Sequence, residues 1–270
     1  MRTSGVTPAV LEKMRKGMNV GDLSSITLLA PGEYQLLQVD APNVPDEELK
    51  AAVRWSVKDS LSYHVDDATI DVLRIPADQT TGDRKKVLYV VAAPNELISR
   101  RAELFERARM KLGVIDIPEM AQRNIAALFE QEGRALALLA FDENGGLLTF
   151  TSEGELYLAR RIEISPGQLQ DADDLLRQQA MERLELEMQR SMDHFDRQFK
   201  HLSVRRLLVS APKAAGLVER LASNLDIPVE QLVLSEVMDM DEVPELGSDD
   251  AQVAAFYALG AALRQEGQAT

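Results

Sequence analysis

Short apolar runs in the middle of the chain predict a β-meander. Residues 136–141, 147–151 and 155–164 are rich in Leu, Phe, Thr, Tyr and Ile. The segment DENGG (142–146) separates the first two runs, and a second turn-forming segment, SEG (152–154), separates the last two. Turn residues between short β-forming runs are typical of antiparallel hairpins. We therefore expect three consecutive strands, and the first turn is open to two interpretations, a plain hairpin or part of a nucleotide site.

Before the meander, the pattern of apolar positions alternates between strand-like and helix-like stretches. Apolar runs bounded by turn residues predict strands at 25–29, 34–40, 68–76, 87–93 and 114–117. Capping residues and helical spacing predict helices that begin near Thr7, Pro45, Asn95 and Pro118, with Gly17 ending the first and Gly113 ending the third. The polar segment 77–86 is expected to be a flexible connection. This alternation indicates a mixed α/β architecture.

After the meander, the pattern predicts one long amphipathic helix and then shorter elements. The long helix covers about residues 169–200, and its apolar face consists of Ala180, Leu184, Met188, Met192, Phe195 and Phe199. Methionine in such a face is more often core filling than a binding groove. The remaining chain predicts a strand at 204–210, a helix at 213–225, an extended stretch at 227–234, an acidic loop at 238–250 and a final helix at 251–264.

The single tryptophan lies in the helix that begins near Pro45. Leu49, Val53, Val57 and Leu61 recur every four residues and predict the buried face of this helix, which places Trp55 on the opposite side. Large aromatic side chains are usually mostly buried, so packing of Trp55 under a neighbouring loop is the favoured interpretation. The alternative is that Trp55 is a docking residue for a partner protein.

Charge and composition narrow the class of protein. The 270 residues carry a formal charge of -14, with a pI near 4.8, and no segregated basic patch is evident. This argues against nucleic-acid binding and against binding to anionic membranes. There is no cysteine, so disulfides and thiol chemistry are excluded. The apolar runs fall well short of the roughly 20 residues of a spanning helix, and no signal-peptide core is present, so we expect a cytoplasmic protein without membrane insertion.

Residues that carry catalysis or bind metals in familiar motifs are not evident. His194 and His201 lie seven residues apart on the predicted long helix and are expected on a solvated face, and His64 has no obvious partner. The acidic segment 238–250 lacks the spacing of a calcium loop. Neither a nucleophile elbow nor a Walker loop occurs. We therefore expect no metal site and no hydrolase or transferase chemistry of the usual kinds.

Four segments in a fixed order resemble a known family. They are LKAAVRWSVKDSLSYHVDDATI (49–70), the stretch 87–117 that begins VLYVVAAPNELISRR, the meander, and LEMQRSMDHF (186–195). Together they resemble the bacterial actin-like proteins of type IV pilus assembly, the PilM-like family, with the MSHA pilus proteins of the MshI type as the nearest likeness. The resemblance covers nearly the whole chain.

The resemblance implies an α/β, actin-like fold of two ribonuclease-H-like lobes. Residues 1–131 would form the first lobe, with a small strand–helix–strand subdomain inserted at about 31–112, and residues 132–270 the second lobe. The implied role is a non-catalytic cytoplasmic scaffold that binds the cytoplasmic N-terminal tail of an inner-membrane assembly protein and is peripheral to that membrane through its partners. The tail is expected in the cleft between the insert and the first lobe, near Trp55. Self-association is a further interpretation.

The residues that would bind nucleotide depart from the pattern of actin-like ATPases. Asp142 with Gly145 and Gly146 corresponds to a phosphate loop, where the carboxylate would lie near the metal and backbone amides near phosphate. The Gly-Gly turn under the adenosine is replaced by Ser210-Ala211-Pro212. The strand pair with the first phosphate loop is not found, so the first lobe is expected to be incomplete, either because the sequence is a fragment or because a partner covers the open edge. We therefore expect no ATP or magnesium cofactor and no ATP hydrolysis; the alternative is an ATPase with a degenerate site that drives pilus or type II secretion assembly.

Overall fold

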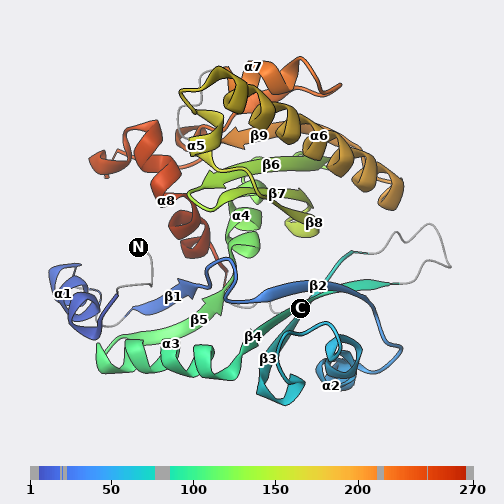
Figure 1. Cartoon of the computed structure of the whole chain (residues 1–270). Coiled ribbons are helices and arrows are strands. Elements are labelled where there is room, and N and C mark those ends of the chain that lie inside the picture. The colour runs from blue at the N-terminus through green and yellow to red at the C-terminus, as the bar shows by residue number, and fades with distance from the viewer. Residues whose placement is uncertain are drawn as a thin grey trace. The chain divides into compact units, whose positions relative to one another are not determined.

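The computed structural model describes residues 6–18, 20, 23–76, 86–211, 216–241 and 243–265 (Figure 1). The chain divides by compactness into two units, residues 1–118 and residues 119–266. The lobe boundary expected near residues 131–132 stays a prediction. The two units are described separately below.

The first unit contains a three-stranded antiparallel sheet in the order β2-β4-β3. Its strands are β2 (Gln35–Asp40), β4 (Val87–Pro94) and β3 (Ala68–Arg74), and helix α2 (Asp46–Val57) packs on it. The predicted stripe explains this packing, because Leu49, Val53 and Val57 are all buried against the sheet. The inserted subdomain expected at about residues 31–112 stays a prediction.

The rest of the first unit pairs two parallel strands, β1 (Ser24–Leu28) and β5 (Lys111–Asp116). Helices α1 (Pro8–Met18) and α3 (Asn95–Arg107) pack on each other through Leu11, Phe105 and Ala108. The prediction that α3 continues to Gly113 is wrong. Arg109 adopts the left-handed conformation with φ 55°, which ends the helical path, and the following residues pair with β1 instead.

The second unit contains a five-stranded sheet in the order β10-β9-β6-β7-β8. The meander is confirmed as β6 (Ala135–Asp142), β7 (Gly145–Ser152) and β8 (Glu155–Ile162), all antiparallel. Strand β9 (Val204–Ser210) runs parallel to β6, and β10 (Val229–Gln231) runs parallel to β9. The sheet therefore mixes antiparallel and parallel pairs, and its assignment to a ribonuclease-H-like second lobe stays a prediction.

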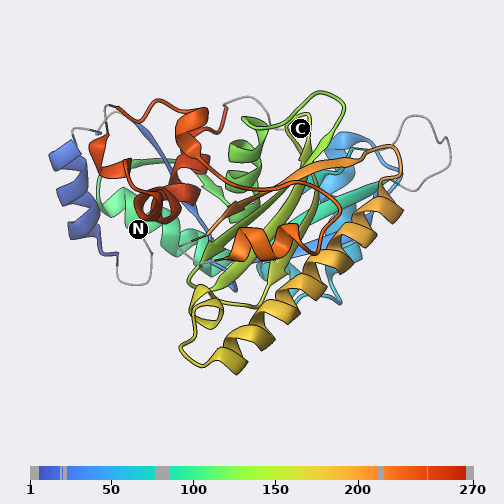
Figure 2. The same ribbon diagram turned by 90° about the horizontal axis from the view of Figure 1, so that it is seen from above.

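Helices cover both faces of this sheet (Figure 2). On one face, α4 (Pro118–Ala127) and α8 (Asp249–Ala262) share a core with alternate residues of β6, namely Leu136, Leu138 and Ala140. On the other face, Phe195 of α6 (Asp174–Gln198) stacks on Phe150 of β7 with ring centroids 4.7 Å apart. Because Phe150 pairs with Ala137, it projects to the face opposite Leu136 and Leu138.

The long helix predicted at about 169–200 is confirmed as α6, which begins later than expected, at Asp174. A short helix, α5 (Pro166–Leu169), precedes α6, and Asp173 caps α6 by accepting from the backbone N–H groups of Leu175 and Leu176. The helix predicted at 213–225 is α7 (Leu217–Ala222), and residues 212–215 lie outside the described ranges, as do residues 77–85 of the predicted flexible connection. In the described ranges, no helix combines the length and apolarity needed to span a membrane.

The packing of α6 predicts a sharp difference between two leucines on one helix. Leu184 is 0% exposed and Leu186 is 44% exposed. We expect Leu184→Ala to lower the free energy of unfolding by about 2–5 kcal/mol, because it leaves a cavity under the sheet. The matched change Leu186→Ala should alter it by about 0.5 kcal/mol. Urea unfolding followed by far-ultraviolet circular dichroism measures both, and equal losses would contradict the packing described.

Candidate functional site

The first turn of the meander, which carries Asp142, Gly145 and Gly146, is a tight two-residue hairpin. Asp142 pairs with Gly145 at the last position of the β6–β7 ladder. The Asp142 carboxylate accepts a hydrogen bond of 2.7 Å from the backbone N–H of Asn144. This contact is an Asx turn, in which a short side chain stabilises the backbone two residues further on. In an ATPase this carboxylate would face a metal ion. Here one of its oxygens is hydrogen-bonded within the turn.

Both glycines of this turn are in close contact with neighbouring strands. Gly145 has φ 134°, and a Cβ atom there would lie 2.5 Å from the carbonyl oxygen of Ile162 in β8. At Gly146 a Cβ atom would lie 3.1 Å from the Phe141 ring and 3.2 Å from Leu139 Cδ1. Hairpin packing alone therefore requires a residue without a side chain at position 145. The assignment of Asp142, Gly145 and Gly146 to a nucleotide loop stays a prediction.

Behind the hairpin, α4 contributes an unusually polar buried face. Glu119, Gln122, Arg123 and Asn124 are all buried. The side-chain nitrogen of Gln122 lies 2.8 Å from the Leu138 carbonyl oxygen and 3.0 Å from that of Leu147. The same nitrogen lies 2.9 Å from Thr149 Oγ1. One amide thus joins α4 to both strands of the hairpin.

Charged groups surround the same region. Glu119 forms an ion pair of 3.3 Å with Arg161 of β8. The hydroxyl of Tyr257 lies 3.4 Å from Gln122 Oε1. Burial raises the pKa of Tyr257 well above its usual range, while Arg161 lowers it and Asp142 and Glu119 raise it further. Tyr257 therefore stays protonated at neutral pH and is a hydrogen-bond donor.

We name these residues, Asp142, Glu119, Gln122, Arg161 and Tyr257, the Asp142 cluster. The sequence identified Asp142 but missed the others, because α4 and α8 reach the hairpin only in the folded chain. The signal that was available is the polar sequence EMAQRN (119–124) inside a helix next to a buried strand. Among the described residues, no group of three His, Asp or Glu side chains is arranged to hold a metal ion. The contacts of the cluster hold helices and strands together.

The segment expected to replace the adenosine loop begins at the end of β9. Ser210 is buried, Ala211 is half-buried, and Pro212 lies outside the described ranges. A cavity of about 10 Å³ lies beside Ser210, lined by Leu234, Asp249 and Gln252 among others. A space of this size holds about one water molecule.

The expectation that Trp55 is buried is wrong. Its side chain is 72% exposed, and the Lys58 ammonium group lies over the ring, 5.8 Å from the centroid. The cause is geometric, because the positions of α2 that face the sheet are taken by Val53 and Val57. An exposed indole favours the alternative interpretation, a docking residue, which stays a prediction.

The histidines lie in three different environments. Burial lowers the pKa of His194, and Arg160 and Arg197 lower it further. The His201 ring lies 6.4 Å from the ring of Tyr157. His64 Nδ1 accepts a hydrogen bond from the backbone N–H of Asp66. These contacts bring no two histidines together.

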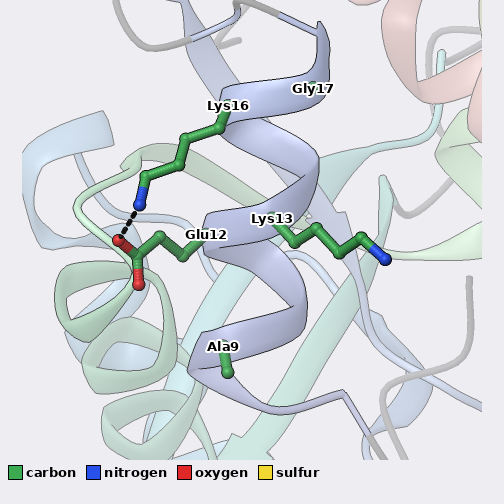
Figure 3. A pocket seen from close by; sticks show the side chains of 5 residues that line it. All are labelled: Ala9, Glu12, Lys13, Lys16 and Gly17. Carbon is green, nitrogen blue, oxygen red and sulfur yellow. Dashed lines mark ion pairs between the residues drawn. The ribbon is translucent and has the colours of Figure 1, made fainter.

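The exposed face of α1 is open and not enclosed by other described elements. It carries Ala9, Glu12, Lys13, Lys16 and Gly17 (Figure 3). Lys16 pairs with Glu12 at 2.8 Å, and Lys13 points away from this pair.

The hairpin geometry predicts that Gly145→Ala destabilises the protein whether or not a nucleotide is present. The substituted residue would combine a disfavoured backbone angle with a contact to Ile162 O that is too short, so we expect a loss of at least about 2 kcal/mol. Gly167→Ala is the matched control, because its Cβ atom would meet only Ser165 Oγ at 3.7 Å. Thermal and urea unfolding give both values. An unchanged stability of Gly145→Ala would show that β8 does not close against this turn.

Comparison with known proteins gives structural likeness and no sequence relative. No protein-family model matches the chain, and no curated protein matches it in sequence. A solved structure described as the PilM-PilN type IV pilus biogenesis complex contains a chain similar to this one, with a TM-score of 0.70 and 18% identity over 97% of this chain and 89% of that chain.

Two further solved structures are more distant. One is the cytoplasmic domain of EpsL, an inner-membrane component of the type II secretion system of Vibrio cholerae, with a TM-score of 0.48 and 13% identity over 96% of this chain and 81% of that chain. The other is a Bacteroides thetaiotaomicron protein described as having an actin-like ATPase fold, with a TM-score of 0.47 and 9% identity over 94% of this chain and 83% of that chain. The mixed α/β architecture and the likeness to the pilus complex chain show that this protein has an actin-like fold.

Proposed function

We propose that this protein is a non-catalytic cytoplasmic scaffold of type IV pilus biogenesis, in an MSHA-like system. It binds the cytoplasmic N-terminal tail of an inner-membrane assembly protein and is held at that membrane through this partner. The observation that supports the proposal is the structural likeness to a chain of the PilM-PilN complex, which extends over 97% of this chain. Because the likeness extends over almost the whole chain and not only over a common core of strands and helices, it favours a similar role for the two proteins.

The chemistry of the Asp142 cluster favours a scaffold over an ATPase. The Asp142 carboxylate bonds to the turn, and Glu119 and Arg161 neutralise each other. The two glycines are explained by contacts with β8 and with the side chains of β6. The alternative, an actin-like ATPase with a degenerate site, needs Asp142 to turn toward a metal-bound phosphate and to give up its bond to Asn144.

Trp55 is the proposed contact for the partner tail. An exposed tryptophan on a rigid helix offers a large apolar area at little cost in side-chain entropy, and tryptophan is enriched among residues that dominate binding energy. Helix α2 is held rigidly, because Leu49, Val53 and Val57 are buried beneath it and Arg54 donates hydrogen bonds to the carbonyl oxygens of Val65 and Ala68. The indole is therefore presented at a fixed position on the small subdomain.

We expect a peptide with the cytoplasmic N-terminal sequence of the neighbouring membrane protein to bind with micromolar affinity. Trp55→Ala should weaken this binding about 30-fold, the effect of losing about 2 kcal/mol at a central contact. Calorimetric titration measures the affinity, and tryptophan emission of the unsubstituted protein reports whether the indole is near the peptide. Leu175→Ala, at a side chain 63% exposed on α6, is the control and should bind as the unsubstituted protein does.

Magnesium-ATP separates the scaffold from the ATPase. In the scaffold, saturating magnesium-ATP leaves the peptide affinity unchanged and Asp142→Ala has no nucleotide binding to remove. If magnesium-ATP gives saturable heat that Asp142→Ala abolishes, and the peptide gives none, the ATPase is the correct alternative.

A further inference from the structure

Helix α1 and the turn after α3 form a basic surface on this acidic protein. Lys13, Arg15 and Lys16 lie on α1, and Arg109 lies in the turn between α3 and β5. The two segments meet because Leu11 of α1 packs on Phe105 and Ala108 of α3. Lys13, Lys16 and Arg109 are exposed, whereas Arg15 is half-buried. We name Lys13, Lys16 and Arg109 the α1 basic surface.

These cations are close enough to act on one carboxylate. Lys16 binds Glu12 at 2.8 Å and is the main cause of the lowered pKa of that group, and Arg15 and Arg109 lower it further. Glu12 is thus shared among several cations and neutralises only part of their charge. Lys13 lies on the same exposed face of the helix, and its side chain points away from the Glu12–Lys16 pair.

The sequence by itself places only part of this surface. Lys13 and Lys16 lie within four residues of one another, and Arg109 is more than ninety residues away from them in the sequence. Folding brings them together. At physiological salt, charges are screened over about 8 Å, so the local positive charge acts largely independently of the net charge of -14.

Exposed apolar side chains accompany the basic surface. Met18, the last residue of α1, is 66% exposed, and Leu23, which follows shortly along the chain, is 62% exposed. Both side chains therefore leave most of their apolar surface in contact with solvent. Cations beside exposed apolar side chains at a helix end are typical of proteins that bind the interface of an anionic membrane, where the cations meet headgroup phosphates and the apolar groups enter the acyl boundary.

We propose that the α1 basic surface binds directly to the anionic lipid surface of the membrane. The cations recognise phosphate-bearing headgroups by charge complementarity, with Lys13 and Lys16 from the open face of α1 (Figure 3) and Met18 and Leu23 as shallow apolar contacts. A lipid surface is favoured over nucleic acid because the apolar side chains have no role on a phosphate backbone. This contact is additional to the partner tail and does not depend on it.

Vesicle sedimentation with the full chain tests the proposal. Vesicles of phosphatidylethanolamine with phosphatidylglycerol should bind the protein, and pure phosphatidylcholine vesicles should not. The double substitution Lys13→Gln with Lys16→Gln should weaken binding about 25-fold, from about fivefold for each charge. The matched control, Lys86→Gln with Lys200→Gln, changes the net charge equally at two other exposed positions and should bind as the unsubstituted protein does.

Two further variants test whether positive charge and apolar contacts cause the binding to vesicles. The double substitution Lys13→Arg with Lys16→Arg, which keeps the charge, should retain binding, and Met18→Ser should weaken it at constant charge. Circular dichroism confirms that each variant is folded. Equal binding to both vesicle types, an equal loss in the Lys86 and Lys200 control, or tighter binding to a DNA duplex than to anionic vesicles would overturn the proposal.

Discussion

Strand β6 is the element on which the second unit depends, because it is paired along both edges and covered on both faces. Its residues from Ala135 to Phe141 are at most 3% exposed. Hydrogen bonding to β7 and β9 satisfies its backbone, and α4 with α8 and α6 cover its faces. At about 25 cal/mol for each Å² of apolar surface removed from water, such a strand dominates the local stability. Its end at Asp142 is therefore fixed, and so is the hairpin that follows.

The buried polar side chains of α4 are acceptable only because nearly all of their partners lie in adjacent elements. An unpaired amide in the interior would cost several kcal/mol. Gln122 avoids this cost by bonding to β6 and β7 together, and Asn124 donates to the carbonyl oxygen of Gly260 in α8. At Gly260 a Cβ atom would lie 2.2 Å from the carbonyl oxygen of Ala121, so the two helices approach at backbone distance. Polar contacts and a glycine thus determine how α4 and α8 pack.

The surfaces proposed to bind partners are exposed, unlike these buried contacts. Trp55 and the α1 basic surface are exposed, belong to the first unit and lie on helices whose inner faces are packed. The Asp142 cluster is enclosed by its own hydrogen bonds and ion pair. Rigid helices that carry exposed side chains support the proposal that this protein works by presenting surfaces to its partners.

The sequence alone determined the meander, the buried stripe of α2 and strand β9, because each follows from a local alternation of side chains that are buried on one face. The actin-like fold was also accessible through the order of its segments. Only the tertiary structure decided the left-handed turn at Arg109, the exposure of Trp55, the contacts of Gln122 and the gathering of cations around Glu12. Each of these depends on which distant segments meet, and a local pattern carries no information about those contacts.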